Sequence, residues 1–393
     1  MNKVFVDFLK LLNNGLYNYN QTVECKLEDV EFEAKNHICI PFIYKGAKNS
    51  NLAIPQEWTD YMVVSTMRNQ HNLQIQQMVL NQLYDANIKC AILKGCSVSV
   101  CYNEPILRTL GDIDILVSHS DYEKAINVLC GDKYEDESCE GHAFHYKYTL
   151  HGVPIEIHKQ VSEYTSKEYG NIIEQKMSKA LDNVLKKQID EFEFPALSNE
   201  YQAATLLLHT QRHFFENRLP VKMLCDWAMF VRSVSQEEWN SAVIPFVREI
   251  GLEDFCNALI DTVNLYLNAE CKSKMTKKIP KEISDAIIME FLNNGVISDK
   301  NSLSNEIATR CSQKKDNGSN KLFSLLLYMN DIAKKEFRLA RVSRLFLPLF
   351  WLYIPMRYVI RVVLGKRTGL SLNAFNETIE RKGFIIKELN LKD

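Results

Sequence analysis

Two aspartates alternate with branched apolar residues in the run Gly111-Asp112-Ile113-Asp114-Ile115-Leu116-Val117. The period of two predicts a strand with both carboxylates on one face, about 7 Å apart. Strands disfavour aspartate, and such breaks in local consistency fall often at functional sites. Two like charges repel each other unless a cation lies between them, and oxygen ligands favour Mg²⁺ or Mn²⁺. The pair therefore predicts a divalent-metal site.

A third acid, Glu156, lies in the similar run Val153-Pro154-Ile155-Glu156-Ile157-His158. If this run forms a strand beside the first, three carboxylates face one point. Three carboxylates can hold two cations roughly 3.5–4 Å apart, the arrangement used for in-line attack on a phosphate. Mutual repulsion predicts that the acids are partly protonated without metal. His158 shares the face of Glu156, and we expect it to orient that acid or contact a ligand.

The run Lys94-Gly95-Cys96-Ser97 falls where a short apolar strand turns into a helix. Backbone N–H groups at such a junction attract anions, glycine permits close approach, and Lys94 adds a positive charge. Arg108, four residues before Asp112, suits bidentate phosphate contact, and a salt bridge to one of the acids is an equal alternative. These residues predict a phosphate-binding corner.

The elements that must position these residues follow from periodicity. We expect helices over 58–86, 98–102 and 121–129, a strand over 88–93, and a hairpin of 142–150 with 153–160 that turns at His151-Gly152. Residues 37–43 could include a strand, and the pattern from residue 162 onward is almost wholly helical. The predicted fold class is α+β: a small mixed β-sheet core with flanking helices, followed by a mostly α-helical C-terminal domain.

The expected domains are an N-terminal extension (1–60), a catalytic core (61–162) and a helical domain (163–393). In order along the chain, the residues Leu93-Lys94-Gly95, Tyr102, Pro105, Arg108, the acidic run 111–117 and Ile155-Glu156-Ile157-His158 resemble nucleotidyltransferase family 5. This family belongs to the polymerase-beta-like nucleotidyltransferase superfamily, and the resemblance covers about residues 66–235.

The resemblance implies transfer of a nucleoside monophosphate from a nucleoside triphosphate such as ATP to an acceptor, with Mg²⁺. It assigns the catalytic and metal-binding roles to Asp112, Asp114 and Glu156. Triphosphate contacts would come from Lys94, Gly95 and Ser97 with Arg108, and His158 would assist. The superfamily turn is usually Gly-Ser or Gly-Gly, whereas Cys96 follows Gly95 here. Either Ser97 takes the phosphate role in a widened turn, or triphosphate binding differs.

The resemblance implies a helical domain that holds base and sugar, so Arg218, Lys222 and Asp226 could line a cleft there. His209 and His213 are four apart and share a helix face, and no glutamate lies between them in the zincin pattern. Arg218, Lys222 and Asp226 follow. Packing and surface ion pairs are the plain alternative for this set.

Composition narrows the class of protein. The chain has 393 residues, 47 basic against 49 acidic, which excludes a uniformly basic nucleic-acid binder. Its eleven cysteines include no C-x-x-C pair, and no signal-peptide core or membrane-length apolar run is present, so we expect a cytoplasmic protein. The partners expected are a nucleoside triphosphate and an acceptor that the sequence does not identify.

Residues 334–367 hold nine basic residues and one acid around an apolar run, residues 345–355. The run is too short to span a bilayer. It could lie in a membrane interface on the inner face of the membrane, bind an anionic polymer, or pack into the helical domain.

Two other functions compete with nucleotidyl transfer. Asp-x-Asp also occurs in nucleotide-sugar-dependent glycosyltransferases, but there the apolar run precedes the acids, whereas here it follows them. The other rival is a non-catalytic module on the same fold that binds a nucleotide or a membrane surface.

Overall fold

The computed structural model describes residues 1–131, 145–161, 167–297, 344–363 and 372–391, together with 326, 329–330, 332–334 and 337. Six strands form one sheet: β1 (Cys90–Ile92), β2 (Ile113–Val117), β3 (His145–Leu150), β4 (Val153–His158), β5 (Leu185–Ile189) and β6 (Phe192–Ala196). The helices before residue 131 are α1 (Lys3–Tyr17), α2 (Leu27–Asn36), α3 (Ile40–Asn49), α4 (Gln56–Asp85), α5 (Cys96–Ser99), η1 (Pro105–Leu107) and α6 (Tyr122–Cys130).

The second half is mostly helical. Its helices are α7 (Lys167–Met177), α8 (Asn199–Glu216), α9 (Val221–Ser233), α10 (Gln236–Glu238), the π-helical turn η4 (Trp239–Val243), α11 (Ile244–Glu249), α12 (Glu253–Tyr266), η5 (Lys272–Lys274), α13 (Lys281–Asn293), η7 (Arg344–Phe346), α17 (Leu347–Val363) and α18 (Leu372–Glu388). No helix in the described part of the chain is both long and apolar enough to cross a membrane.

The sheet is mixed, with strand order β3-β4-β2-β1-β6-β5. The pairs β1–β2, β3–β4 and β5–β6 are antiparallel, whereas β2–β4 and β1–β6 are parallel. The central strand β2 is buried along its whole length. Because the sheet is covered on both sides, a polar side chain on β2 lies between two layers and needs a partner.

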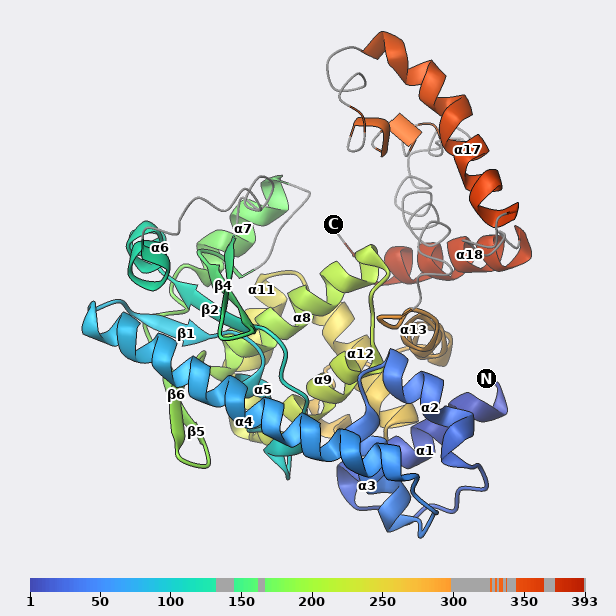
Figure 1. The fold of residues 1–393 in the computed structure, drawn as a ribbon, viewed down its shortest axis with the longest axis horizontal. Coiled ribbons are helices and arrows are strands. Elements are labelled where there is room, and N and C mark those ends of the chain that lie inside the picture. The colour runs from blue at the N-terminus through green and yellow to red at the C-terminus, as the bar shows by residue number, and fades with distance from the viewer. Residues whose placement is uncertain are drawn as a thin grey trace.

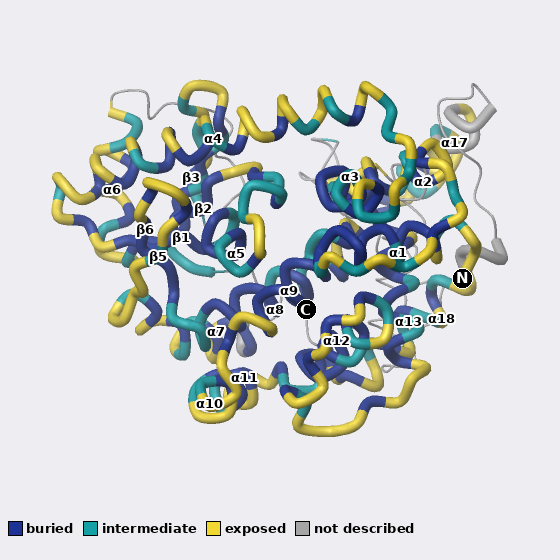
Figure 2. Tube along the Cα trace, turned by 90° about the horizontal axis from the view of Figure 1, so that it is seen from below, coloured by how far each residue is buried: buried dark blue, intermediate teal, exposed yellow. Residues whose placement is uncertain are grey.

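Side-chain alternation divides the interior into two clusters. Ile113, Ile115 and Val117 of β2 face α4 and α6, in the smaller cluster. Leu116 faces the other way, into the larger cluster that includes α8, α9 and the N-terminal helices. Figure 1 shows α4 along one side of the sheet and α8 and α9 on the helical side. Figure 2 shows buried residues concentrated along α1, α8 and α9. Asp114 lies on the same face of β2 as Leu116 and therefore faces the helices α8 and α9.

The structure confirms the α+β fold class, the long helix before the first strand, and the hairpin with its turn at His151-Gly152. Residues 142–144 of the predicted hairpin lie outside the described residues. The suggested strand over 37–43 is wrong: the segment starts α3, with Pro41 in the first turn, where proline suits a helix. Strands β5 and β6 were not predicted, because the sequence after residue 162 was expected to be almost wholly helical.

Candidate functional site

The parallel pairing of β2 with β4 brings together two of the predicted acids. Asp114 lies directly opposite Glu156, and Leu116 lies opposite His158. Glu156 and His158 alternate with Ile155 and Ile157, which are buried on the α4 side. Asp114, Glu156 and His158 each offer a ligand atom, and these atoms lie within 4.8 Å of one another. The two runs of alternating residues thus converge as expected.

Two cationic groups hold Asp114, which is only 2% exposed. Lys94 Nζ lies 2.8 Å from its Oδ1, and His158 Nε2 lies 3.0 Å from the same oxygen. Burial by itself would raise the pKa of Asp114, but Lys94 and His158 outweigh it and hold the pKa well below its usual range. Asp114 is therefore a carboxylate in the folded protein.

Glu156 has its own partners. His158 Nε2 lies 3.5 Å from its Oε2, and Lys147 Nζ donates to its Oε1 at 2.9 Å. The hydrogen bond from His158 is the main cause that lowers the pKa of Glu156 to about 2. Burial opposes the charge of His158, yet hydrogen bonds to Asp114 and Glu156 raise the pKa of the imidazole.

Asp112 lies just before β2 and is exposed. The negative charge of Asp114 raises the pKa of Asp112 above its usual value. The expectation that all three acids are partly protonated without metal is thus wrong for Asp114 and Glu156, because lysine and histidine neutralise them. For Asp112 the direction of the expectation is right, because its pKa is raised. The structure therefore brings Asp114, Glu156 and His158 together in one cluster. Asp112 lies outside this cluster, close enough to Asp114 for the two charges to interact.

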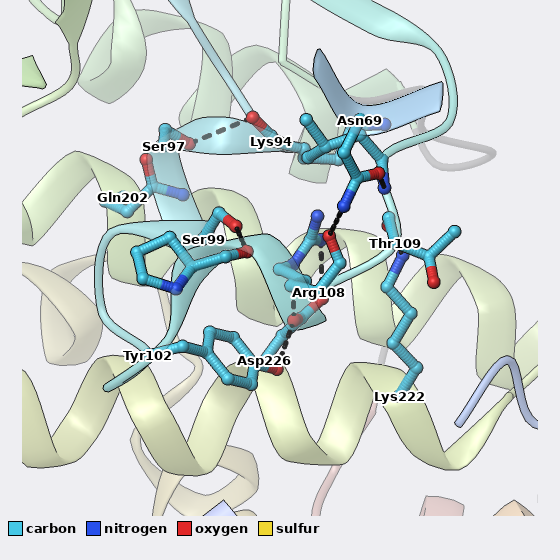
Figure 3. Close-up of polar contacts among 12 residues, drawn as sticks. Asn69, Lys94, Ser97, Ser99, Tyr102, Arg108, Thr109, Gln202, Lys222 and Asp226 are labelled. Atoms are coloured by element: carbon cyan, nitrogen blue, oxygen red, sulfur yellow. Dashed lines mark hydrogen bonds and ion pairs between the residues drawn. The ribbon is translucent and has the colours of Figure 1, made fainter. Parts of the chain in front are cut away.

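The turn after β1 shows how the chain accommodates Cys96. Gly95 has φ +61°, a conformation that favours glycine. Cys96 turns its thiol inward, where it donates to Gln76 Oε1 of α4 at 2.9 Å. Ser97 is fully buried, and its hydroxyl donates to the Lys94 carbonyl at 3.2 Å (Figure 3). Of the predicted phosphate-binding residues at this turn, Lys94 and Gly95 line the cavity described below.

Arg108 is buried, and its guanidinium makes two hydrogen bonds of 2.7 Å to the carboxylate of Asp226 on α9. The Tyr102 hydroxyl donates to Asp226 Oδ1 at 2.6 Å (Figure 3). Arg108 therefore forms a salt bridge, which was one of the two predicted roles, but its partner is Asp226 rather than Asp112 or Asp114. The Asp226 partner raises the pKa of Arg108 despite its burial, so the pair is ionic. This cluster ties the loop before β2 to the helical side.

Two asparagines of α4, which the sequence analysis missed, hold the same loop. Asn69 Nδ2 donates to the carbonyls of Ile106 and Arg108, and its Oδ1 accepts from the Leu110 amide (Figure 3). Asn72 Nδ2 donates to the Gly111 carbonyl at 2.6 Å. Both asparagines are buried on α4, and buried polar side chains need partners; asparagines within a run of otherwise core-facing helix positions were the available signal.

A cavity of about 370 Å³ opens over Asp112 and Asp114, and Glu156 and His158 are not among the residues that line it. Its floor includes Lys94, Asp112 and Asp114, and its walls come from α8 and α9. The three cleft residues suggested from the sequence, Arg218, Lys222 and Asp226, line this cavity, and so do His209 and His213.

Burial shifts the pKa values of Lys222 and of the two histidines. Lys222 Nζ donates to the Thr109 carbonyl at 2.6 Å, as in Figure 3, and burial with the charge of Arg108 lowers its pKa to about 8. Burial also lowers the pKa of His209 well below its usual value and that of His213 to about 4. The two imidazole rings meet edge to face, with centroids 4.4 Å apart.

The donor set fits a hard divalent cation. Two carboxylates and one imidazole within 4.8 Å match the ligands that Mg²⁺ or Mn²⁺ accepts. Lys94 and His158 neutralise the same Asp114 oxygen in this structure, so a cation at Asp114 would compete with them. Metal binding therefore requires Lys94 to turn toward another anion and His158 to be neutral.

A mixed sheet that carries paired acids on adjacent strands, with a helical wall facing them, defines the class of fold and site. A family model described as uncharacterised nucleotidyltransferase matches residues 33–268. The chain belongs to this family, which confirms the resemblance and supports nucleotidyl transfer as the class of reaction. No curated protein and no solved structure matched the chain.

Proposed function

We propose that this protein is a metal-dependent nucleotidyltransferase that moves a nucleoside monophosphate from a nucleoside triphosphate to an acceptor hydroxyl. The observation that carries the proposal is the register of β2 and β4, which places Glu156 opposite Asp114, and Asp114 lines a cavity large enough for a ligand. Membership of the nucleotidyltransferase family supports the reaction class.

Asp114, Glu156 and His158 would hold Mg²⁺ or Mn²⁺, with Asp112 at the mouth as a further ligand. When bound, the cation neutralises triphosphate charge and polarises the attacking oxygen. Lys147 stays beside Glu156 and orients it by hydrogen bonding. Under this proposal the catalytic residues lie on the face of β2 and β4 that points toward α8.

The triphosphate would lie over Lys94 and Gly95. Lys94 already points at Asp114 and is charged, because Asp114 and Asp112 raise its pKa against the effect of burial. A triphosphate would offer this ammonium group a second anion, and Gly95 leaves room for close approach. Arg108 contributes by fixing the loop before β2 through Asp226, so its role here is positional.

The acceptor would enter between the sheet and the α8–α9 wall, where Lys222 and Arg218 line the cavity. Under this proposal residues 61–162, which include strands β1 to β4, provide the chemistry, and helices after residue 163 provide the acceptor wall. Residues 1–60 pack against the helical side.

Asp114→Asn tests the proposal. We expect magnesium-dependent pyrophosphate release from a triphosphate and a panel of acceptors to fall by two orders of magnitude or more, because the metal contributes several kcal/mol to the transition state. Manganese binding, followed by electron paramagnetic resonance, should weaken in parallel. Asp85→Asn, an exposed acid at the end of α4, is the matched control and should change neither. Unchanged pyrophosphate release by Asp114→Asn would overturn the proposal.

A further inference from the structure

Helix α17 presents an apolar face to solvent. Seven large apolar side chains of η7 and α17 are exposed, and at about 100° per residue they fall within an arc of about 120°. We call this set the apolar arc: Leu345, Phe346, Leu349, Leu352, Tyr353, Met356 and Ile360. Leu352 is 77% exposed and Leu349 is 64% exposed, which is unusual for leucine on a helix with a buried side.

The opposite side of α17 is packed, so the orientation of the arc is fixed. Leu347 and Ile354 are buried with Met329 and Ala333 in a small cluster separate from the two main ones. The Trp351 indole donates to Asn330 Oδ1 at 2.8 Å on that side. Figure 1 shows α17 lying away from the sheet and from α8 and α9, beyond α18. The arc therefore faces outward from a helix that its own cluster supports.

The sequence around the arc is strongly basic. Residues 334–367 hold nine basic residues and one acid, and residues 344–363 hold three arginines and no acid. The Arg357 guanidinium lies 5.8 Å from the Tyr353 ring centroid and 5.9 Å from that of Phe337, at one border of the arc. The rest of the chain carries a net charge of −10, so the positive charge is local.

We propose that α17 docks on an anionic lipid surface, with the apolar arc in the acyl boundary and the arginines on the headgroups. A helix of 17 residues rises about 25 Å, less than the roughly 30 Å of a bilayer core, so it would lie in the interface. The Tyr353 hydroxyl is the only polar side-chain group in the arc. A protein partner would be expected to find about one hydrogen bond per 100–200 Å², and a second copy would bring positive charge against positive charge.

Vesicle flotation of the full-length chain tests this inference, which does not depend on the proposed function. We expect binding to vesicles of equal parts phosphatidylglycerol and phosphatidylcholine, and little binding to phosphatidylcholine alone. Leu349→Glu, Leu352→Glu and Met356→Glu together should weaken binding at least about tenfold. The matched control adds the same three charges to exposed apolar residues of α4, as Val63→Glu, Val64→Glu and Met67→Glu, and should bind as the unchanged chain does.

A second variant separates charge from apolar contact. Arg344→Gln with Arg361→Gln should reduce the preference for phosphatidylglycerol, and higher salt should do the same. Far-ultraviolet circular dichroism and thermal unfolding establish that each variant is folded. Equal flotation of the arc variant and the unchanged chain would overturn the proposal. So would a dimer in sedimentation velocity that the arc substitutions dissolve while vesicle binding stays absent, because the arc would then cover a second copy.

Discussion

Asp114 is a buried charge that the protein stabilises with two cations on one oxygen. A carboxylate in this surrounding would be costly without partners, since burial favours its neutral form. Lys94 and His158 reverse that preference at 2.8 and 3.0 Å. Asp114 is thus already ionised, and a metal ion or a triphosphate bound under the proposed function would replace one ionic partner at this site by another. This preorganisation follows from residue types that the sequence displays, once the strands are paired.

The histidines of the helical wall make stability depend on pH. Burial holds the pKa of His213 near 4 against 6.5 for an ordinary histidine, with His209 and Glu216 as its titratable neighbours. The unfolded chain therefore binds a proton that the folded one does not, so stability is full above pH 6.5 and declines from there toward pH 4. With the His213 side chain 25% exposed, we expect about 2 kcal/mol for this group.

Urea unfolding at intervals between pH 7 and pH 4, in the presence of a chelator, measures this slope. His213→Gln should flatten it by about 2 kcal/mol over that window, because glutamine does not titrate. His151→Asn, at the exposed turn of the β3–β4 hairpin, should leave the slope as it is. A slope that is the same in His213→Gln as in the unchanged protein would contradict the assignment.

The roles of residues could be predicted where they depend on neighbours in the sequence, but not where they depend on contacts between segments far apart in the chain. Asp114 and Glu156 could be aligned because each alternates with branched apolar residues that set its strand face. The type and spacing of Arg108 allowed two partners near β2, yet its partner Asp226 is 118 positions away on α9. Nothing in the residue types fixes such a pairing, since it depends on how the loop before β2 reaches the helices.

At the scale of elements, α1 and α3 show how close two helices can lie. A Cβ at Gly46 would come 1.9 Å from the Leu11 carbonyl oxygen, and one at Gly15 would come 1.9 Å from the Phe42 carbonyl oxygen. The two backbones therefore touch at reciprocal glycines. Glycine is costly in a helix interior, and this contact explains why the cost is tolerated at both positions.

Gly46→Ala should destabilise the protein. Helix propensity alone predicts a gain of about 1 kcal/mol for alanine, but the Cβ would force the backbones apart, so we expect a net loss of about 2 kcal/mol or more. Thermal unfolding of the full chain checks the sign. Lys48→Ala, at an exposed position on the same helix, should change stability by less than about 0.5 kcal/mol. A more stable Gly46→Ala protein would mean that the two helices do not touch as described.

The helices and strands that could be predicted were those in which apolar residues recur at regular spacing. Helix α4 is 30 residues long with apolar residues at helical spacing, and the structure places it within two residues of the expected range. Strand β5 has two lysines and a glutamine among five residues, and it is mostly exposed. A short charged segment has no apolar period to distinguish it from a helix end or loop, so β5 was missed. Strand β6 does alternate over Phe192, Glu193 and Phe194, but it is short and holds Pro195, a residue that argues against a strand.

At the scale of the whole molecule, the cavity over Asp112 and Asp114 lies between the two main hydrophobic clusters. The floor comes from β1 and β2, whose outward residues join α4 and α6, and the walls come from α8 and α9 in the larger cluster. The Arg108–Asp226 pair and the Lys222–Thr109 hydrogen bond bridge the two. A ligand that contacts both floor and wall should therefore stabilise the chain as a whole.

Nucleotide binding should be visible as such a stabilisation. At a hundredfold excess of ligand over its dissociation constant, a ligand that binds only the folded state adds about 2.7 kcal/mol. We expect a nucleoside triphosphate with Mg²⁺ to raise the unfolding temperature, and a nucleotide sugar with Mg²⁺ to have little effect. Asp114→Asn should lose the magnesium-dependent part of the shift, because Asp114 is the buried oxygen donor between Lys94 and His158. Stabilisation by nucleotide sugars, with no stabilisation by nucleoside triphosphates, would instead favour a glycosyltransferase.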